Sequence, residues 1–131
     1  MKELKAGIIG NDEVIVTEAN TAAAMGSGTL PVFATPALVA LMEKTAQESV
    51  QDALEEGCGS VGTLICAKHV SATPIGMKVT CKSELVAVEG RKLAFKITAS
   101  DACGIVGEAD HERFIIQNEK FLKKANSKNE Q

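Results

Sequence analysis

One long helix is the feature that most constrains this sequence. Thr35 followed by Pro36 is typical of a helix start, and Gly57 and Gly59 are typical of a helix end. A helix over 36–56 would be about 30 Å long at ~1.5 Å per residue, enough to cross a small domain from end to end. We therefore predict this helix, with Thr35 as its N-cap, as the element around which the chain packs.

The predicted helix has one apolar face and one polar face. The apolar or small residues of its packing face are Leu38, Leu41, Met42, Thr45, Ala46, Ser49 and Ala53. The opposite face carries Lys44, Gln47, Glu48, Gln51, Asp52 and Glu55. Glu43 falls on the border between the two faces, and we expect the helix to pack one face against a large surface.

Five other segments have the composition or alternation of β-strands. They are 13–19, 62–73, 76–88, 91–100 and 104–118. Residues typical of tight turns separate the last four, which implies successive hairpins and an antiparallel sheet. Residues 20–33 suit a loop or a short irregular helix. Residues 119–131 lose their apolar periodicity, so we expect this tail to fray.

A strand, one long helix and four strands in hairpin succession predict an α+β fold. We expect a single domain over residues 1–131, in which a curved antiparallel sheet of about five strands wraps around the helix, as in the hotdog fold. The length of 131 residues and the 45% hydrophobic content suit one domain with a sizeable core.

The composition argues against several classes of partner. A net charge of -3, 3% aromatic residues and no Trp or Tyr do not suit a nucleic-acid binder. No segment has the length and hydrophobicity of a membrane span or a signal peptide, so we expect a cytoplasmic protein with no membrane partner. The four cysteines form no CxxC pair and no cluster with histidine, so we expect no metal site and reduced thiols.

Three residues could carry chemistry, and each also has an ordinary explanation. Glu43 lies in the first half of a helix, where negative charge is favoured. His69 lies in a strand with few other polar groups, where a histidine is often structural. His111 lies in "EADHERF", which suggests a cross-strand charge network.

The sequence resembles the hotdog-fold thioesterases of the fluoroacetyl-CoA thioesterase type from about Glu13 to Phe121. The resemblance rests on "GSGTLPVFATPALVALME", "HVSATPIGMKVT", "LVAVEGRKLAFKITASDACGIVGEADHERF" and their spacing. It implies that Thr35, Glu43 and His69 form the active site. It further implies that a homodimer, with sites at the subunit interface, hydrolyses a short acyl-CoA thioester. It does not imply that fluoroacetyl-CoA is the substrate.

The residue types suit this chemistry in two ways. Thioester hydrolysis needs a nucleophile or a positioned water, a base and donors for the oxyanion. In the first mechanism Thr35 attacks, His69 is the base and Glu43 orients the imidazole. In the second, Glu43 activates water or forms a mixed anhydride, while Thr35 and backbone amides hold the oxyanion. We favour the first.

We also expect a compact substrate pocket and a dimer. The residues expected to contact substrate are Val32, Phe33, Gly62 and Arg113. Thr35 and Glu43 are ~12 Å apart along the helix axis, so substrate lies between them or a partner subunit completes the site in a homodimer or tetramer. No cofactor is expected beyond the CoA of the substrate. The alternatives are a hydratase or dehydratase acting on acyl-CoA, and a non-catalytic acyl-CoA-binding or dimerisation module.

Overall fold

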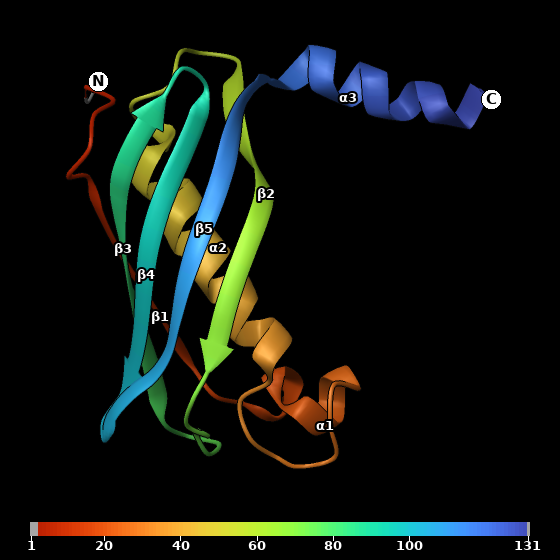
Figure 1. Cartoon of the computed structure of the whole chain (residues 1–131). Helices are drawn as coiled ribbons and strands as arrows, with labels where there is room; N and C mark the ends of the chain where they lie inside the picture. Colours follow the sequence, from red (N-terminus) through yellow and green to blue (C-terminus); the bar gives the residue numbers. More distant parts are fainter. Residues whose placement is uncertain (1–2, 131) are drawn as a thin grey trace.

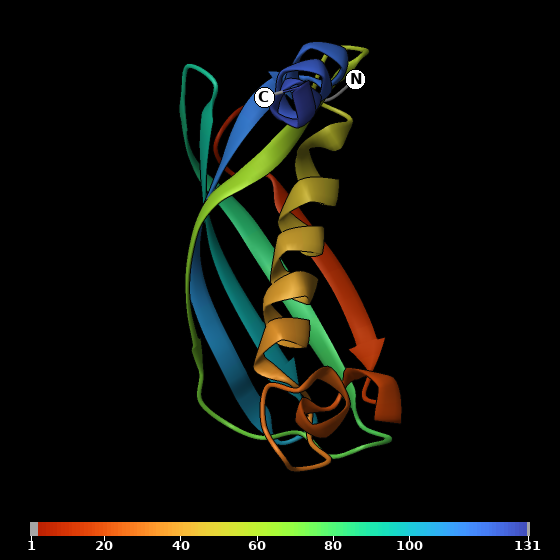
Figure 2. The same cartoon turned by 90° about the vertical axis from the view of Figure 1, so that its right-hand side faces the viewer.

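A five-stranded antiparallel sheet curves around one long helix (Figures 1 and 2). The computed structural model describes residues 3–130. The strands are β1 Ile9–Ile15, β2 Cys58–His69, β3 Lys78–Glu89, β4 Lys92–Asp101 and β5 Gly104–Gln117. The helices are α1 Ala22–Met25, α2 Thr35–Gln51 and α3 Asn118–Asn126, with 3₁₀ turns at Glu18–Asn20 and Ser127–Glu130. The sheet order is β1-β3-β4-β5-β2, so β1 and β2 are its edges.

The core lies between α2 and the concave face of the sheet. Alternate residues of β3 and β4 point toward the helix because side chains alternate between the two faces of a strand. Those in the core are Val79, Cys81, Leu85, Leu93, Phe95 and Ile97, and they meet Leu38, Leu41, Met42 and Ala46 of α2. The five-stranded antiparallel sheet around one helix is the predicted hotdog architecture. The predicted packing face of the helix is confirmed from Leu38 to Ser49, whereas Ala53 lies beyond the end of the helix and is half-buried.

The long helix is shorter than predicted at its C-terminal end. It ends at Gln51, with Asp52 as its C-cap, and the following turn buries Leu54. The Gln51 side chain donates a hydrogen bond of 2.9 Å to the carbonyl of Cys58, which begins β2. The helix was predicted to continue because the polar residues after Gln51 keep the helical pattern. In the structure the chain turns there instead, and this turn buries Leu54.

The helix start also differs from the prediction. Ala34 is the N-cap, and Thr35 is the first helical residue, followed by Pro36. Among residues 3–130, no side chain makes a capping hydrogen bond at the helix start. The Thr35 hydroxyl is consequently not used to cap α2, which leaves it available for another contact.

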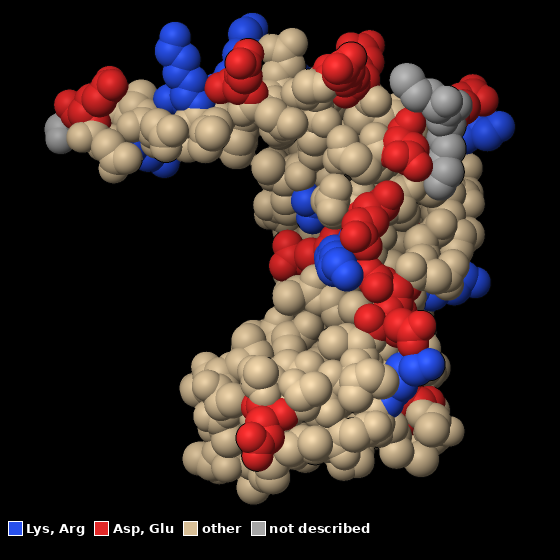
Figure 3. Space-filling view, turned by 180° about the vertical axis from the view of Figure 1, so that it is seen from behind, with Lys and Arg blue, Asp and Glu red and all other residues tan. Residues whose placement is uncertain are grey.

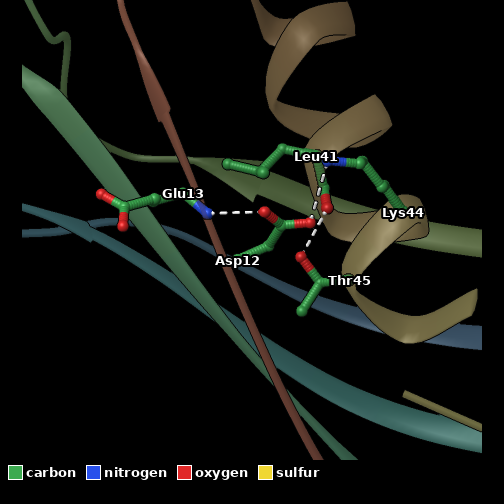
Figure 4. Close-up of polar contacts among 5 residues, drawn as sticks. All are labelled: Asp12, Glu13, Leu41, Lys44 and Thr45. Carbon is green, nitrogen blue, oxygen red and sulfur yellow. Dashed lines mark hydrogen bonds and ion pairs between the residues drawn. The ribbon is translucent and has the colours of Figure 1, made fainter. Parts of the chain in front are cut away.

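Strand β1 begins earlier than predicted and is held against the helix. It pairs with β3, and the chain turns after Ile15 because Asn20 accepts a hydrogen bond from the Thr17 N–H at 2.8 Å. Asp12 of β1 makes a 3.2 Å ion pair with Lys44 of α2 (Figure 4). The edge strand is thereby tied to the middle of the helix.

The C-terminal segment is helical over residues 118–130, where the sequence predicts a frayed tail over 119–131; Gln131 lies outside the described residues. Helix α3 follows β5 and projects past β2, away from the body of the domain (Figure 1). From behind, it overhangs a hollow in the molecular outline (Figure 3). Phe121 and Leu122 of α3 are exposed. Within residues 3–130, no helix is both long and apolar enough to cross a membrane.

Candidate active site

Thr35 and His69 meet at one end of the molecule. Thr35 starts α2, and His69 ends β2, where it is opposite Gly107 of β5. The Thr35 Oγ1 atom lies 2.8 Å from His69 Nδ1. A hydroxyl and an imidazole at this distance are the geometry expected of a nucleophile and its base.

Burial favours the neutral form of His69. The half-buried environment lowers the pKa of His69 below its usual value, and the backbone of Ser71 acts in the opposite direction. The Nε2 atom is buried and has no hydrogen-bond partner among residues 3–130. A neutral imidazole with its hydrogen on Nε2 would leave Nδ1 free to accept the Thr35 proton.

A pocket of about 280 Å³ opens beside this pair. Its lining consists of Ala22, Ser27, Val32, Phe33, Thr35, His69, Val70, Ser71 and Ala72. Val32 and Phe33, both expected to contact substrate, are therefore at the pocket, although the Phe33 side chain is itself buried. The lining contains no charged side chain other than the titratable His69.

Glu43 lies elsewhere, two turns along α2. A Cβ atom added to Gly62 would lie 2.9 Å from Glu43 Oε2. The same Cβ would lie 3.3 Å from His111 Cε1 and 3.5 Å from Arg113 Nη1. Glu43, His111 and Arg113 therefore converge on Gly62, and we call these four residues the Glu43 cluster.

His111 is buried in this cluster beside Arg113 and takes no part in the ion pairs of its neighbours Asp110 and Glu112, with which the sequence grouped it in a cross-strand charge network. Its ring is 1% exposed, because residues 111 and 113 share the inner face of β5. The charge network exists on the outer face, where Asp110 pairs with Lys96 and Glu112 pairs with Lys92. The period-two spacing of His111 and Arg113 was the signal that could have placed them together.

The hydrogen bonds of His111 define its protonation state. Nδ1 is 2.7 Å from the Leu64 carbonyl, which can only accept, and Nε2 is 3.2 Å from Arg113 Nη1, which can only donate. The ring is therefore neutral, with its hydrogen on Nδ1. Burial is the largest cause that lowers the pKa of His111, the Leu64 carbonyl opposes it, and the Arg113 charge adds to the lowering.

Arg113 is held rigidly by Ser60. Its Nε donates to Ser60 Oγ and its Nη2 donates to the Ser60 carbonyl, both at 2.7 Å. Ser60 was not among the residues predicted for the site, because no sequence motif marks its contact with Arg113. The guanidinium is thus fixed beside Glu43, whose charge acts on the pKa of both Arg113 and His111.

The Thr35–His69 pair and the Glu43 cluster together have the groups that acyl transfer needs, but within one chain they are too far apart to act on the same substrate atoms. One end of α2 offers a hydroxyl with a base, and the Glu43 cluster offers a carboxylate and fixed donors ~12 Å further along the helix. The described residues contain no group of three His, Cys, Asp or Glu side chains that could hold a metal ion.

Comparison with known proteins identifies relatives of this chain. The fluoroacetyl-CoA-specific thioesterase family matches residues 16–119. The fluoroacetyl-CoA thioesterase of Streptantibioticus cattleyicolor is 44% identical over 97 residues, which cover 74% of this chain and 70% of that protein.

Solved structures agree with this match. A variant of the fluoroacetyl-CoA thioesterase FlK, with a threonine replaced by serine and bound to acetyl-CoA, has a TM-score of 0.91 and 34% identity, and the match covers 95% of this chain and 98% of that one. A thioesterase superfamily member from Thermus thermophilus has a TM-score of 0.90 and 25% identity, and the match covers 99% and 96% of the two chains.

Proposed function

The chain belongs to the fluoroacetyl-CoA-specific thioesterase family, and on this basis we propose that Thr35 and His69 hydrolyse the thioester of a short acyl-CoA. The activity, hydrolysis of an acyl-CoA thioester, is that of the relatives. The observation that carries the residue assignment is the 2.8 Å contact between Thr35 Oγ1 and His69 Nδ1.

The reaction proceeds in two steps. His69 takes the Thr35 proton as the hydroxyl oxygen attacks the thioester carbonyl, and CoA leaves as its thiol after receiving that proton. Backbone N–H groups at the start of α2 are free of side-chain caps and can stabilise the oxyanion. Water then attacks the acyl-threonine ester and releases the free acid.

Glu43 does not have the role expected from the sequence, which was to orient the His69 imidazole. Its carboxylate lies in the Glu43 cluster and not at the imidazole, so it does not orient His69 within one chain. We place it across the substrate, contributed by a second copy of the chain, where it can activate the water of the second step. Gly62 leaves room for it, because a Cβ atom at this position would lie 2.9 Å from Glu43 Oε2 and the carboxylate would have to shift.

The acyl group is small. The pocket beside Thr35 has a volume of about 280 Å³, near the lower limit for small-molecule sites. Its walls include Val32 and two alanines, and the buried ring of Phe33 closes one side. Acyl groups of two to four carbons, including halogenated ones, suit such a space.

A homodimer completes the site. Strand β2 is a free edge, and none of its 12 residues is fully buried. Its backbone and the exposed Leu64 side chain offer a surface on which another strand can pair. The hollow beneath α3 lies next to this edge (Figures 1 and 3), so a second copy can approach it without obstruction.

An assay for thiol release tests the function. Purified protein is mixed with acetyl-, fluoroacetyl-, butyryl-, hexanoyl- and palmitoyl-CoA, and free CoA is measured with a thiol reagent. Release of CoA from the short substrates supports hydrolysis, whereas a hydratase would leave the thioester intact and a binding module would show no turnover. A higher kcat/KM for palmitoyl-CoA than for the two- to four-carbon substrates would contradict the small pocket.

A further inference from the structure

A second pocket lies where α3 leaves the sheet, far from Thr35. It has a volume of about 420 Å³. Its lining consists of Arg91, Ile116, Gln117, Lys120, Phe121 and Lys124. Three of the six residues are cationic and none is acidic. The pocket on the outer face of the sheet is different, since it pairs Lys68 and Lys96 with Glu108 and Asp110.

The three cations have no ion-pair partner among residues 3–130. Lys124 lies in the last turn of α3, where a positive charge also complements the helix dipole. That explanation does not extend to Arg91, which belongs to the turn between β3 and β4. Arg91 is one of only two arginines in a chain of net charge -3, and the other, Arg113, is buried and fully engaged.

The acyl-CoA substrate creates a need for such a site. Its nucleotide end carries a pyrophosphate and a 3′-phosphate, which are bound by lysine and arginine. The pocket at Thr35 contains neither residue type. Arg113 is held by Ser60 and lies beside Glu43, so it is not available to a phosphate.

We propose that the pocket formed by Arg91, Lys120, Lys124 and Phe121 binds the 3′-phospho-ADP end of the acyl-CoA substrate. The three cations hold the phosphates, and the exposed Phe121 ring provides a surface for adenine stacking. This inference rests on the proposed function and on the proposed dimer. It adds a subsite that is separate from the reacting residues.

The dimer brings the two pockets together. A two-fold axis through the free β2 edge pairs the two copies of β2 antiparallel. The His69 end of one copy then lies beside the Cys58 end of the other. Helix α3 starts at that end, since the Asn118 N–H bonds to the Gly57 carbonyl at 3.0 Å. The nucleotide pocket of one copy therefore serves the Thr35–His69 pair of the other.

Truncated substrates test this subsite. The double variant Arg91→Gln/Lys124→Gln removes two pocket cations, and Lys123→Gln/Lys128→Gln removes the same charge from the C-terminal segment outside the pocket. Both are compared with the unmodified dimer using acetyl-CoA, acetyl-dephospho-CoA and S-acetylpantetheine. Thermal unfolding and sedimentation are recorded to show that each variant keeps its fold and dimer.

The pocket variant should raise the KM for acetyl-CoA at least about tenfold, with kcat little changed, because phosphate binding is the same in the ground and transition states. The KM for S-acetylpantetheine should be unchanged, and the control variant should resemble the unmodified protein. An unchanged KM for acetyl-CoA, or an equal rise with S-acetylpantetheine, would overturn the proposal. If the unmodified protein releases no thiol from any of the three substrates, the proposed function itself is wrong.

Discussion

The Thr35 hydroxyl and the His69 imidazole, 34 positions apart in the sequence, lie within 2.8 Å of each other. The contact forms because α2 begins where β2 ends, so the first residue of the helix faces the last residue of the strand. With Ala34 as the N-cap, the hydroxyl makes its contact with the imidazole and not with the helix backbone.

The pH dependence of hydrolysis should reflect neutral His69. Because burial lowers the pKa of His69, the acidic limb of the kcat/KM profile should have its midpoint below the usual histidine value of about 6.5. Activity should be full above that midpoint and fall as the pH decreases through it. A profile measured in the His69→Ala variant should lack this limb, and a midpoint above 7 would contradict the assignment.

The Glu43 carboxylate should be required for turnover. Glu43→Gln keeps the shape of the side chain but removes its charge, so it should lower kcat by roughly 10²–10⁴ while the dimer remains intact. Gly62→Ala should also lower kcat, because its Cβ would lie 2.9 Å from the carboxylate and displace it. Thermal unfolding of both variants separates this effect from misfolding. Near-normal turnover of Glu43→Gln would remove Glu43 from the mechanism.

His111 should make the protein sensitive to acid. Its pKa is lowered in the folded state by burial, so below pH ~6.5 the unfolded chain takes up a proton that the folded chain resists. Stability should therefore be complete above that pH and decrease as the pH falls toward the lowered folded-state value. His111→Asn retains a donor for the Leu64 carbonyl and cannot titrate.

Urea unfolding at pH 7.5 and pH 5.5 measures this effect. Between the two values, the His111→Asn variant should lose less stability than the unmodified protein, even though its stability at pH 7.5 is lower. His69 also has a lowered pKa and contributes in the same direction, so a residual loss is expected. Equal losses in the two proteins would show that His111 is not the group responsible.

The chain should be dimeric at micromolar concentration. Leu64 is 47% exposed on the free β2 edge, and Leu64→Lys should weaken the dimer because lysine on an edge strand disfavours pairing. Val86→Lys is a matched control, since Val86 is 38% exposed on β3, away from that edge. Sedimentation equilibrium distinguishes the outcomes. A monomer in the unmodified protein contradicts the dimer, whereas a tetramer is compatible with it.

The pattern of the sequence predicted the sheet and the packing face of the helix because both depend on local alternation. Element ends were less predictable. The helix was expected to reach Glu56, but burial of Leu54 in a turn ends it at Gln51. The 119–131 tail was expected to fray because its sequence lacks apolar periodicity. That pattern is absent because α3 packs no buried residue against the core.

Several residues of the candidate site could be predicted from the sequence, but their contacts could not. The resemblance predicted Thr35, Glu43 and His69 as site residues, but sequence spacing could not show which of them are in contact. That depends on the bulge between Gly62 and Leu64 and on the register of β2 against β5, which puts Gly62 opposite Arg113. The Glu43 cluster and the contribution of Ser60 arise from this pairing and have no local signature.

The most direct test of the central claim is a double-mutant cycle on Thr35 and His69, measured as CoA release from acetyl-CoA. Thr35→Ala and His69→Ala should each lower kcat by roughly 10²–10⁴, and the combined variant should be little worse than either alone, because the two residues act as one unit. Thr35→Ser should retain most activity, and Thr35→Ala should keep its stability since Thr35 does not cap the helix. Near-normal turnover by His69→Ala, or losses that multiply in the combined variant, would contradict the account.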